Sequence, residues 1–325
     1  MRLKNIDISG NGLTLLITTY RRAINVQNIL RLSINQGLTK ILVYADGPKD
    51  NDFSVQKQIG QFIDELKRKN PGIEILFRKE KNNQGCALSV IKAIDWLFQE
   101  TENGVILEDD CIPGPDFFNY VRMALPLVNK LENCKTVSGC QFAEIPLKES
   151  WFTSKYPMFW GWATTRDVWR EMRESFSGRI SHRERLIRNF FTSEYNFWKS
   201  GNRRALQGFV DTWDLPLAYW MFKNNYLTIV PKENLVTNIG DDVNATHTKN
   251  PMFILNFAND GKFNDPTSLP GYSPPIDDYI KRRVYHISGR HFISTKITYL
   301  KDLFRLNKPV RGPLKLRVKI CDLSN

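Results

Sequence analysis

Hydrophobic and polar positions along the first 120 residues follow two alternating periods. Short apolar runs rich in β-branched residues predict strands, and each is followed by a segment whose apolar residues recur every three or four positions, which predicts a helix. Strands that alternate with helices of this length indicate βαβ units, so we expect an α/β fold with a mixed, mainly parallel sheet flanked by helices. The expected strands are 13–19, 41–44, 73–77 and 104–107, and the expected helices are 22–35, 54–69 and 86–99.

The pattern is less regular after residue 120. We expect helices over 115–131 and 211–224, a strand over 227–230 and a loop-rich segment over 231–280. Neither an internal repeat nor a linker divides the chain before about residue 280. We therefore expect one domain over 1–280, followed by a basic C-terminal tail over 281–325.

The positive charge of the 325-residue chain, +12 in total, is concentrated in that tail. Residues 281–325 hold 12 Lys and Arg but only two acids, while residues 1–280 are nearly neutral. A basic chain often indicates a nucleic-acid-binding protein, but this body has neither the charge nor an RRM, KH or helix-turn-helix signature. We therefore expect no nucleic-acid partner.

Within the tail, apolar residues of the segment 290–308 fall at near-helical spacing, with lysine and arginine between them. A basic amphipathic helix of this kind suits an anionic membrane surface, so 290–325 is a candidate docking segment. A helix packed on the domain with a solvated charged face fits the pattern equally well. No apolar run approaches ~18 residues and the N-terminus lacks a signal-peptide core, so we expect a cytoplasmic chain, with peripheral contact to the inner face of the membrane as an option.

Cysteine and histidine usage excludes two further classes of protein. The five cysteines form no CxxC pair and the four histidines no HExxH arrangement, so neither a disulfide scaffold nor a zinc site is indicated. Cys111, which follows an acidic cluster, is interpreted as a buried thiol at a strand end.

That acidic cluster, Glu108-Asp109-Asp110, directly follows the strand 104–107. Alternation along a strand would place Glu108 and Asp110 on one side and Asp109 on the other. Carboxylates this close repel each other unless positive charge lies between them. Mg²⁺ or Mn²⁺ takes one or two carboxylates and completes its shell with phosphate oxygens, so a metal site is expected here. The alternative is a solvated acidic turn before the next helix.

Two more polar groups close strands of the predicted sheet, where ligands of parallel sheets bind. Thr19, Tyr20 and Arg22 end the first strand, and Asp46-Gly47 ends the second. An acid at this second position can accept a hydrogen bond from a nucleobase or a ribose, although Asp-Gly is also an ordinary turn signal. GxGxxG and GxxxxGK[ST] sequences are absent, which argues against dinucleotide oxidoreductases and P-loop enzymes.

Together these groups resemble a nucleotide-sugar glycosyltransferase of the GT-A (Rossmann-like) fold. The segment 108–118, EDDCIPGPDFF, is similar to the EDD-x-x-x-x-PDFF segment of the N-acetylglucosaminyltransferase I family, and bacterial proteins of this kind are nearer still. Further similar segments follow in order between residues 13 and 248: Phe159-Trp160-Gly161-Trp162-Ala163, Val168-Trp169, Trp213-Asp214, Val230-Pro231 and Asn238-Ile239-Gly240.

The resemblance implies a donor half over 1–125 and an acceptor half over 126–280. Asp110 would be the ligand of a Mn²⁺ or Mg²⁺ ion that bridges to the donor diphosphate. Glu108 and Asp109 would contact the sugar and ribose, and Asp46 the uracil of a UDP-sugar. The donor-binding residues it implies are Thr19, Tyr20, Arg22, Asp46, Gln84, Glu108 and Asp109.

The chemistry of an inverting transfer adds a second acid. One carboxylate must take the proton from the acceptor hydroxyl as that oxygen attacks the anomeric carbon. Asp214 and Asp211 are both candidates for this base, because they lie nearly one helical turn apart. The spacing alone does not decide which of the two is the base. The resemblance of Trp213-Asp214 to the family's tryptophan-aspartate pair favours Asp214.

Two weaker candidates lie in the second half. His247 could complete the metal shell or contact the diphosphate, or it could be an ordinary surface residue. The aromatic residues of 151–169 are mostly expected in the core, and only the neighbourhood of Trp160 is assigned to acceptor binding.

The function expected from all this is a metal-dependent inverting glycosyltransferase of the hexosyl or N-acetylhexosaminyl type. It would move a sugar such as N-acetylglucosamine from a UDP-sugar to a hydroxyl of a glycan or lipid-linked acceptor, in cell-surface polysaccharide synthesis. The alternative enzyme class is a sugar-phosphate nucleotidyltransferase, which usually shows a glycine-rich loop after the first strand where this chain has Thr-Thr-Tyr-Arg-Arg.

Overall fold

The computed structural model describes residues 12–128, 130–143, 148–177, 193–240 and 263–287, with residues 301 and 314. His247 and nearly all of the segment 290–325 therefore lie outside the described residues, and the predictions made for them stay predictions.

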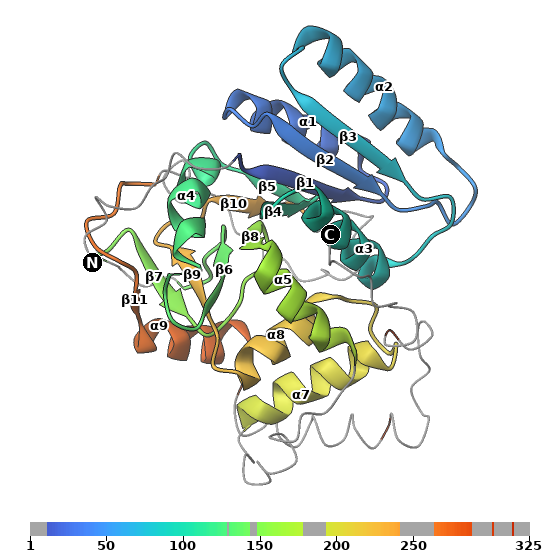
Figure 1. The fold of residues 1–325 in the computed structure, drawn as a ribbon. Coiled ribbons are helices and arrows are strands. Elements are labelled where there is room, and N and C mark those ends of the chain that lie inside the picture. The colour runs from blue at the N-terminus through green and yellow to red at the C-terminus, as the bar shows by residue number, and fades with distance from the viewer. Residues whose placement is uncertain are drawn as a thin grey trace.

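Four parallel strands form the N-terminal part of a central sheet, in the order β3-β2-β1-β4 (Figure 1). They are β1 (Thr14–Thr19), β2 (Lys40–Ala45), β3 (Glu74–Lys79) and β4 (Asn103–Glu108). In the register of the sheet, Thr18 of β1 lies between Tyr44 of β2 and Glu108 of β4. The carboxyl ends of these three strands therefore finish level with one another.

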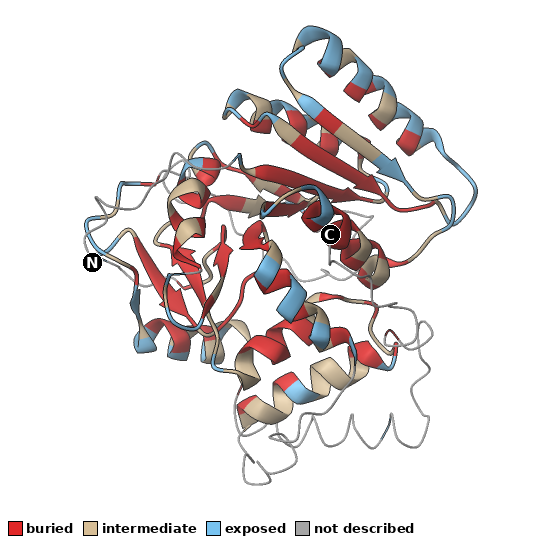
Figure 2. Cartoon of the chain, in the orientation of Figure 1, coloured by how far each residue is buried: buried red, intermediate tan, exposed pale blue. Residues whose placement is uncertain are grey.

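Helices cover both faces of these strands. The helices α1 (Ala23–Asn35) and α2 (Ser54–Lys69) lie on one face and α3 (Cys86–Glu100) on the other (Figure 1). α2 buries one stripe that includes Ile59 and Ile63, and its opposite face is exposed (Figure 2). All the helices and strands predicted for this part of the chain are confirmed, with ends shifted by at most two residues.

The sheet continues into the C-terminal half without a break. Its nine described strands have the order β11-β7-β9-β6-β8-β4-β1-β2-β3, and three of the eight pairings are antiparallel. The added strands are β6 (Cys134–Ser138), β7 (Trp151–Ser154), β8 (Trp162–Thr165), β9 (Leu227–Pro231) and β11 (Gly271–Tyr272). The prediction of an α/β, Rossmann-like fold with a mixed, mainly parallel sheet is confirmed.

Helices of this half differ in part from expectation. The helix predicted over 115–131 is α only from Phe117 to Ala124 (α4) and continues as a 3₁₀ turn, Leu125–Leu127, because Pro126 has no N–H for the α-helical ladder. The helix predicted over 211–224 begins later, as α8 (Asp214–Lys223). The other helical segments are α5 (Arg166–Met172), Arg173–Ser177 (3₁₀), α7 (Ser193–Leu206), α9 (Pro274–Tyr279) and Ile280–Val284 (π).

A small second sheet joins distant parts of the chain. β5 (Cys111–Pro113) pairs antiparallel with β10 (Val236–Asn238). The backbone N–H of Ile239 then donates to the carbonyl oxygen of Asp110 at 2.9 Å. This pairing brings residues 236–240 against the end of β4.

The strands form the core of the molecule (Figure 2). Leu15, Leu16 and Ile17 of β1 are fully buried, as expected for a central strand covered on both faces. In the described parts of the chain, none of the helices has both the length and the apolar character that a bilayer crossing requires.

Candidate functional site

The level ends of β1, β2 and β4 border a cavity of about 420 Å³. Polar side chains predominate in its lining, as expected where parallel strands end. Eight candidate residues from the sequence line it together: Thr19, Tyr20, Arg22, Asp46, Glu108, Asp109, Asp110 and Asp211. Gln84 and Asp214 are not among its lining residues. The sequence-based prediction that these strand-end residues converge is therefore confirmed, while their roles stay predictions.

Arg22 holds the two aspartates of the acidic cluster together. Its Nη1 lies 2.8 Å from Oδ1 of Asp109 and 3.1 Å from Oδ2 of Asp110. The expectation that Asp109 and Asp110 point to opposite sides is wrong. β4 ends at Glu108, so both aspartates belong to a turn and strand alternation no longer governs them.

The two aspartates differ in how fully their oxygens are used. Asp109 is buried and also accepts hydrogen bonds from the Thr19 hydroxyl at 2.7 Å and the Tyr20 backbone N–H at 3.2 Å, both on Oδ2. On Asp110, the contact to Oδ1 is the weak donor Cys111 Sγ at 3.5 Å. Asp110 therefore has more acceptor capacity left than Asp109.

This arrangement fits a divalent cation that arrives with its ligand. Within the described chain, no group of three or more His, Cys, Asp or Glu side chains is arranged to enclose a metal. Mg²⁺ and Mn²⁺ do not need such a cage, because one carboxylate together with phosphate oxygens and water completes their shell. Asp110 offers that carboxylate, and the nearby Gly240 keeps it accessible: a Cβ there would lie 2.4 Å from Oδ2.

Glu108 lies in surroundings that disfavour its ionised form. Burial, followed by the charges of Asp110 and Asp214, raises the pKa of Glu108 well above its ordinary value. Burial and the charge of Asp109 also raise the pKa of Asp110, while Arg22 lowers it. The negative charges of Asp109, Asp110 and Asp214 thus all act on Glu108, while the ion pairs of Arg22 are with Asp109 and Asp110. Added positive charge would stabilise this group of acids.

Asp46 has a different surrounding from the acids on β4. Its Oδ1 accepts the backbone N–H groups of Gly47 and Gln84 at 2.9 and 2.8 Å. Its Oδ2 accepts the Asn83 amide and the Gly85 backbone N–H at 3.0 and 3.1 Å. Asp46 therefore fixes the turn before α3 against the end of β2. Gln84 contacts Asp46 through its backbone N–H, while its side chain contacts Asn82 and Lys92.

The two candidate bases are also distinguished by their contacts. Asp211 is buried and accepts backbone N–H groups of Cys86 on Oδ2 at 3.1 Å and of Ala87 on Oδ1 at 3.4 Å. Asp214 accepts the Thr212 hydroxyl and the Leu215 N–H on a single oxygen, Oδ1. No hydrogen bond from the described residues reaches Oδ2 of Asp214, so this oxygen is free to accept a proton.

Most aromatic residues of 151–169 belong to the core, as predicted. Trp151, Tyr156, Trp162 and Trp169 are at most 1% exposed. Trp160 is half-buried and packs edge-on against Phe142, with ring centroids 5.3 Å apart. Trp160 is thus the tryptophan of this segment with surface to offer a ligand, although it does not line the cavity at the strand ends.

Sequence reasoning missed several lining residues. Lys49 and Arg21 lie beside Tyr20, with their charged groups 5.9 and 4.9 Å from its ring centroid. Ser89 lines the cavity one turn into α3, and its place after Gly85 was the available signal, because the first turn of a helix faces the strand ends. The buried Tyr20 hydroxyl has no hydrogen-bond partner among the described residues, which leaves a polar atom for a ligand.

Cys111 is fully buried at the start of β5, so the interpretation of its thiol as a structural one is confirmed. Burial raises the pKa of this thiol well above its ordinary value. A reactive thiolate is therefore not expected beside Asp110.

No protein-family model matches the chain, and no curated protein matches it significantly, so the family resemblance stays a prediction. Among solved structures, a mannosyltransferase (PcManGT) from Pyrobaculum calidifontis, in complex with GDP-Man and Mn²⁺, is 16% identical with a TM-score of 0.34 and covers 50% of this chain and 45% of its own. S. aureus TarS 1–349 is 10% identical with a TM-score of 0.34 and covers 50% and 49%. A putative glucose-1-phosphate thymidylyltransferase from Bacillus anthracis is 12% identical with a TM-score of 0.32 and covers 54% and 79%.

The match therefore spans about half the length of the first two of these proteins. Similarities of this size carry no conclusion about activity, which has to be argued from the site.

Proposed function

We propose that this protein is a metal-dependent inverting glycosyltransferase that moves a sugar from a UDP-sugar to a hydroxyl of a glycan or lipid-linked acceptor. One observation carries the proposal: an acidic cluster with spare carboxylate capacity lies at the joined ends of three parallel strands, and a separate acid with a free oxygen lies beside it. An inverting transfer needs this pair of differently placed acids.

The donor would occupy the cavity between β1, β2 and the turn before α3. The Tyr20 hydroxyl supplies an unused polar group there, and Lys49 and Arg21 supply positive charge near the pyrophosphate. Asp46 already accepts four hydrogen bonds from protein donors, so its role in this proposal is to hold the Asn83–Gly85 turn in place beside the donor cavity. Residues 1–125 would then form the donor half and 126–280 the acceptor half.

Asp110 would hold the Mn²⁺ or Mg²⁺ ion, with His247 as a second proposed ligand. When bound, such an ion stabilises the negative charge that builds on the leaving diphosphate. Arg22 keeps Asp109 and Asp110 in one orientation and offsets part of their repulsion before the donor arrives. Glu108, at the end of β4 in the same cluster, would face the transferred sugar.

Asp214 would take the proton of the acceptor hydroxyl. Its Oδ1 is fixed by Thr212 and Leu215, so the carboxylate is oriented while Oδ2 remains available. Asp211 is unsuited to this role because both of its oxygens already accept backbone N–H groups of α3. Trp160, on the same half of the chain, would cover an apolar face of the acceptor sugar.

The proposal is tested by measuring which nucleotide sugars protect the protein against heating, with and without Mn²⁺. We expect a UDP-sugar to raise the melting temperature of the wild type in the presence of Mn²⁺ and to have no effect on Asp110→Ala. If no UDP-sugar stabilises the wild type more than that variant, the donor assignment is wrong.

Product analysis separates the two enzyme classes. A glycosyltransferase releases UDP from the protecting donor, whereas a sugar-phosphate nucleotidyltransferase releases pyrophosphate from a nucleoside triphosphate and a sugar 1-phosphate. Asp214→Asn should keep thermal protection by the donor and lose UDP release. Transfer that persists in this variant would move the base to another residue.

A further inference from the structure

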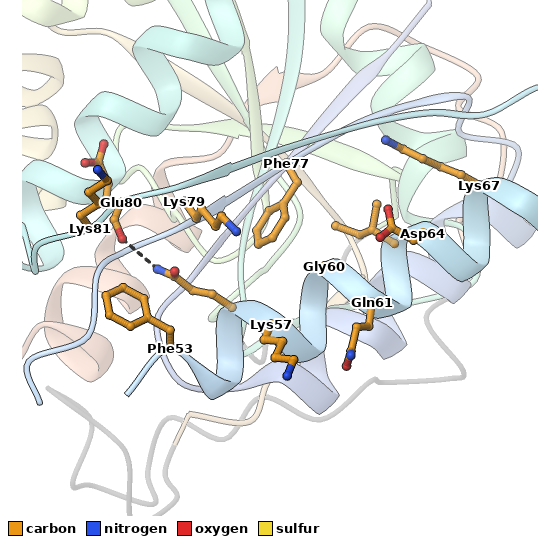
Figure 3. A pocket seen from close by; sticks show the side chains of 12 residues that line it. Phe53, Lys57, Gly60, Gln61, Asp64, Lys67, Phe77, Lys79, Glu80 and Lys81 are labelled. Atoms are coloured by element: carbon orange, nitrogen blue, oxygen red, sulfur yellow. Dashed lines mark hydrogen bonds between the residues drawn. The ribbon is translucent and has the colours of Figure 1, made fainter. Parts of the chain in front are cut away.

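A second cavity lies away from the site just described, between α2 and the strand β3 (Figure 3). It has a volume of about 550 Å³. One wall is the stripe of α2 that contains Lys57, Gly60 and Lys67, and the other is the face of β3 and its extension that carries Phe77, Lys79 and Lys81. We call this cavity the α2–β3 groove.

One helix position in the wall of the groove, Gly60, lacks a side chain. A Cβ placed on Gly60 would lie 3.5 Å from the Phe77 ring, at ordinary contact distance. With glycine there, the half-buried Phe77 ring forms an apolar floor between helix and strand. The groove therefore offers a ligand an apolar contact on Phe77, and its volume of about 550 Å³ leaves room for side chains.

Its charge is predominantly positive. Lys57, Lys67, Lys79 and Lys81 line it, and no carboxylate of the described residues forms an ion pair with any of them. Of the two acids in the lining, Glu80 accepts the Tyr44 hydroxyl at 2.6 Å and Asp64 lies on α2, so the four lysines exceed the acids by two. Lysines also discourage uncontrolled pairing of edge strands, but a row of them beside a cavity selects for acidic ligands.

The backbone of β3 offers a second kind of contact. β3 ends the sheet, so in the described structure no strand pairs with its outer side. The N–H groups of Glu74 and Glu80 point toward β2, where they donate to Thr39 and Ala45. Alternation along a parallel strand then directs the N–H and C=O groups of Ile75, Phe77 and Lys79 outward.

We propose that the α2–β3 groove binds an extended acidic segment of a partner protein, which adds a strand to the sheet along β3. Main-chain hydrogen bonds to β3 would give the affinity, as in other complexes formed by strand addition. Acidic side chains would meet Lys57, Lys79 and Lys81, and small apolar side chains between them would rest on Phe77. This surface lies outside the donor cavity, so the proposal does not rest on the proposed reaction.

Fluorescence anisotropy with the full chain tests this proposal. The probe is a labelled peptide of alternating glutamate and valine, six residues long like β3. We expect saturable binding that weakens about tenfold or more when every peptide bond of the probe is N-methylated. This change keeps the charge of the probe, but it removes the backbone donors and places methyl groups where a strand would pair. Lys79→Glu/Lys81→Glu should weaken binding by a similar factor, and Gly60→Leu should do so by filling the groove.

Lys69→Glu is the matched control, because Lys69 lies on the exposed side of α2, outside the groove, and should leave binding within about twofold of the wild type. Equal binding of the methylated and unmethylated probes would overturn the proposal, since contact would then be purely electrostatic. Absence of peptide binding, or binding confined to phosphatidylserine vesicles, would overturn it as well and leave the groove as a lysine-protected sheet edge or a membrane contact.

Discussion

Asp211 accepts a hydrogen bond from the backbone N–H of Cys86, 3.1 Å away and 125 residues earlier in the chain. Cys86 is the first residue of α3, whose N-terminal N–H groups have no partners within the helix. The acid therefore caps a helix that lies far from it in the sequence, and its negative charge suits the positive end of that helix.

This relationship predicts a loss of stability in Asp211→Ala. Removing the capping carboxylate leaves buried N–H groups without acceptors, and we expect the free energy of unfolding to fall by about 1–3 kcal/mol in urea titrations. Asp278→Ala is the control, because Asp278 is exposed and pairs with Arg282 on the surface, where the change should stay below about 1 kcal/mol. Equal effects of the two substitutions would show that Asp211 does not cap α3.

The raised pKa of Glu108 predicts a dependence of stability on pH. Since the folded pKa lies above the unfolded one, this residue favours the folded state most below the unfolded pKa of about 4, and that contribution is lost as the pH rises through the folded pKa. Glu108→Gln lacks this titration. Measured with a chelator present, its free energy of unfolding should exceed that of the wild type by about 1 kcal/mol or more at pH 8, with the difference vanishing near pH 4. A difference that is constant with pH would contradict the burial of Glu108 among acids.

The absence of a side chain at Gly240 leaves space for the Asp110 carboxylate, and filling that space should affect donor binding. A Cβ at this position would lie 2.4 Å from Oδ2 of Asp110, so Gly240→Ala should turn that carboxylate away from its present direction. We expect donor affinity in Mn²⁺, measured by calorimetry, to fall about tenfold or more, which corresponds to about 1.4 kcal/mol. Gly72→Ala is the control, because a Cβ there meets nothing within 4 Å. Unchanged affinity in Gly240→Ala would separate Asp110 from donor binding.

The N-terminal strands and helices could be predicted because the spacing of apolar residues within each segment is enough to mark it as a strand or a helix. β6, β7 and β8 were missed for the opposite reason: they are four or five residues long and buried on nearly every position, so no alternation marks them. The strand-end acids were found because ends of parallel strands meet. A local pattern does not show where a strand stops, so it could not predict that Asp109 and Asp110 both contact Arg22. Nor does it show which distant segments pack together, so it could not predict the contact of Asp211 with α3.

The hydrogen bonds of Asp46 predict a loss of stability in Asp46→Asn. Each of its oxygens accepts two hydrogen bonds, so Asp46→Asn places an amide N–H₂ group against two donors, whichever way the new side chain turns. The turn before α3 would lose its attachment to β2, and we expect the free energy of unfolding to fall by about 2–4 kcal/mol. Donor affinity should fall with it, because the turn lines the cavity. Asp50→Asn is the matched control. Asp50 lies four residues away and is exposed, with surface contacts to Arg21 and to the Asp52 N–H, so its substitution should leave stability nearly unchanged. If Asp46→Asn instead lost donor affinity at full stability, Asp46 would contact the nucleotide directly, as the sequence alone led us to expect.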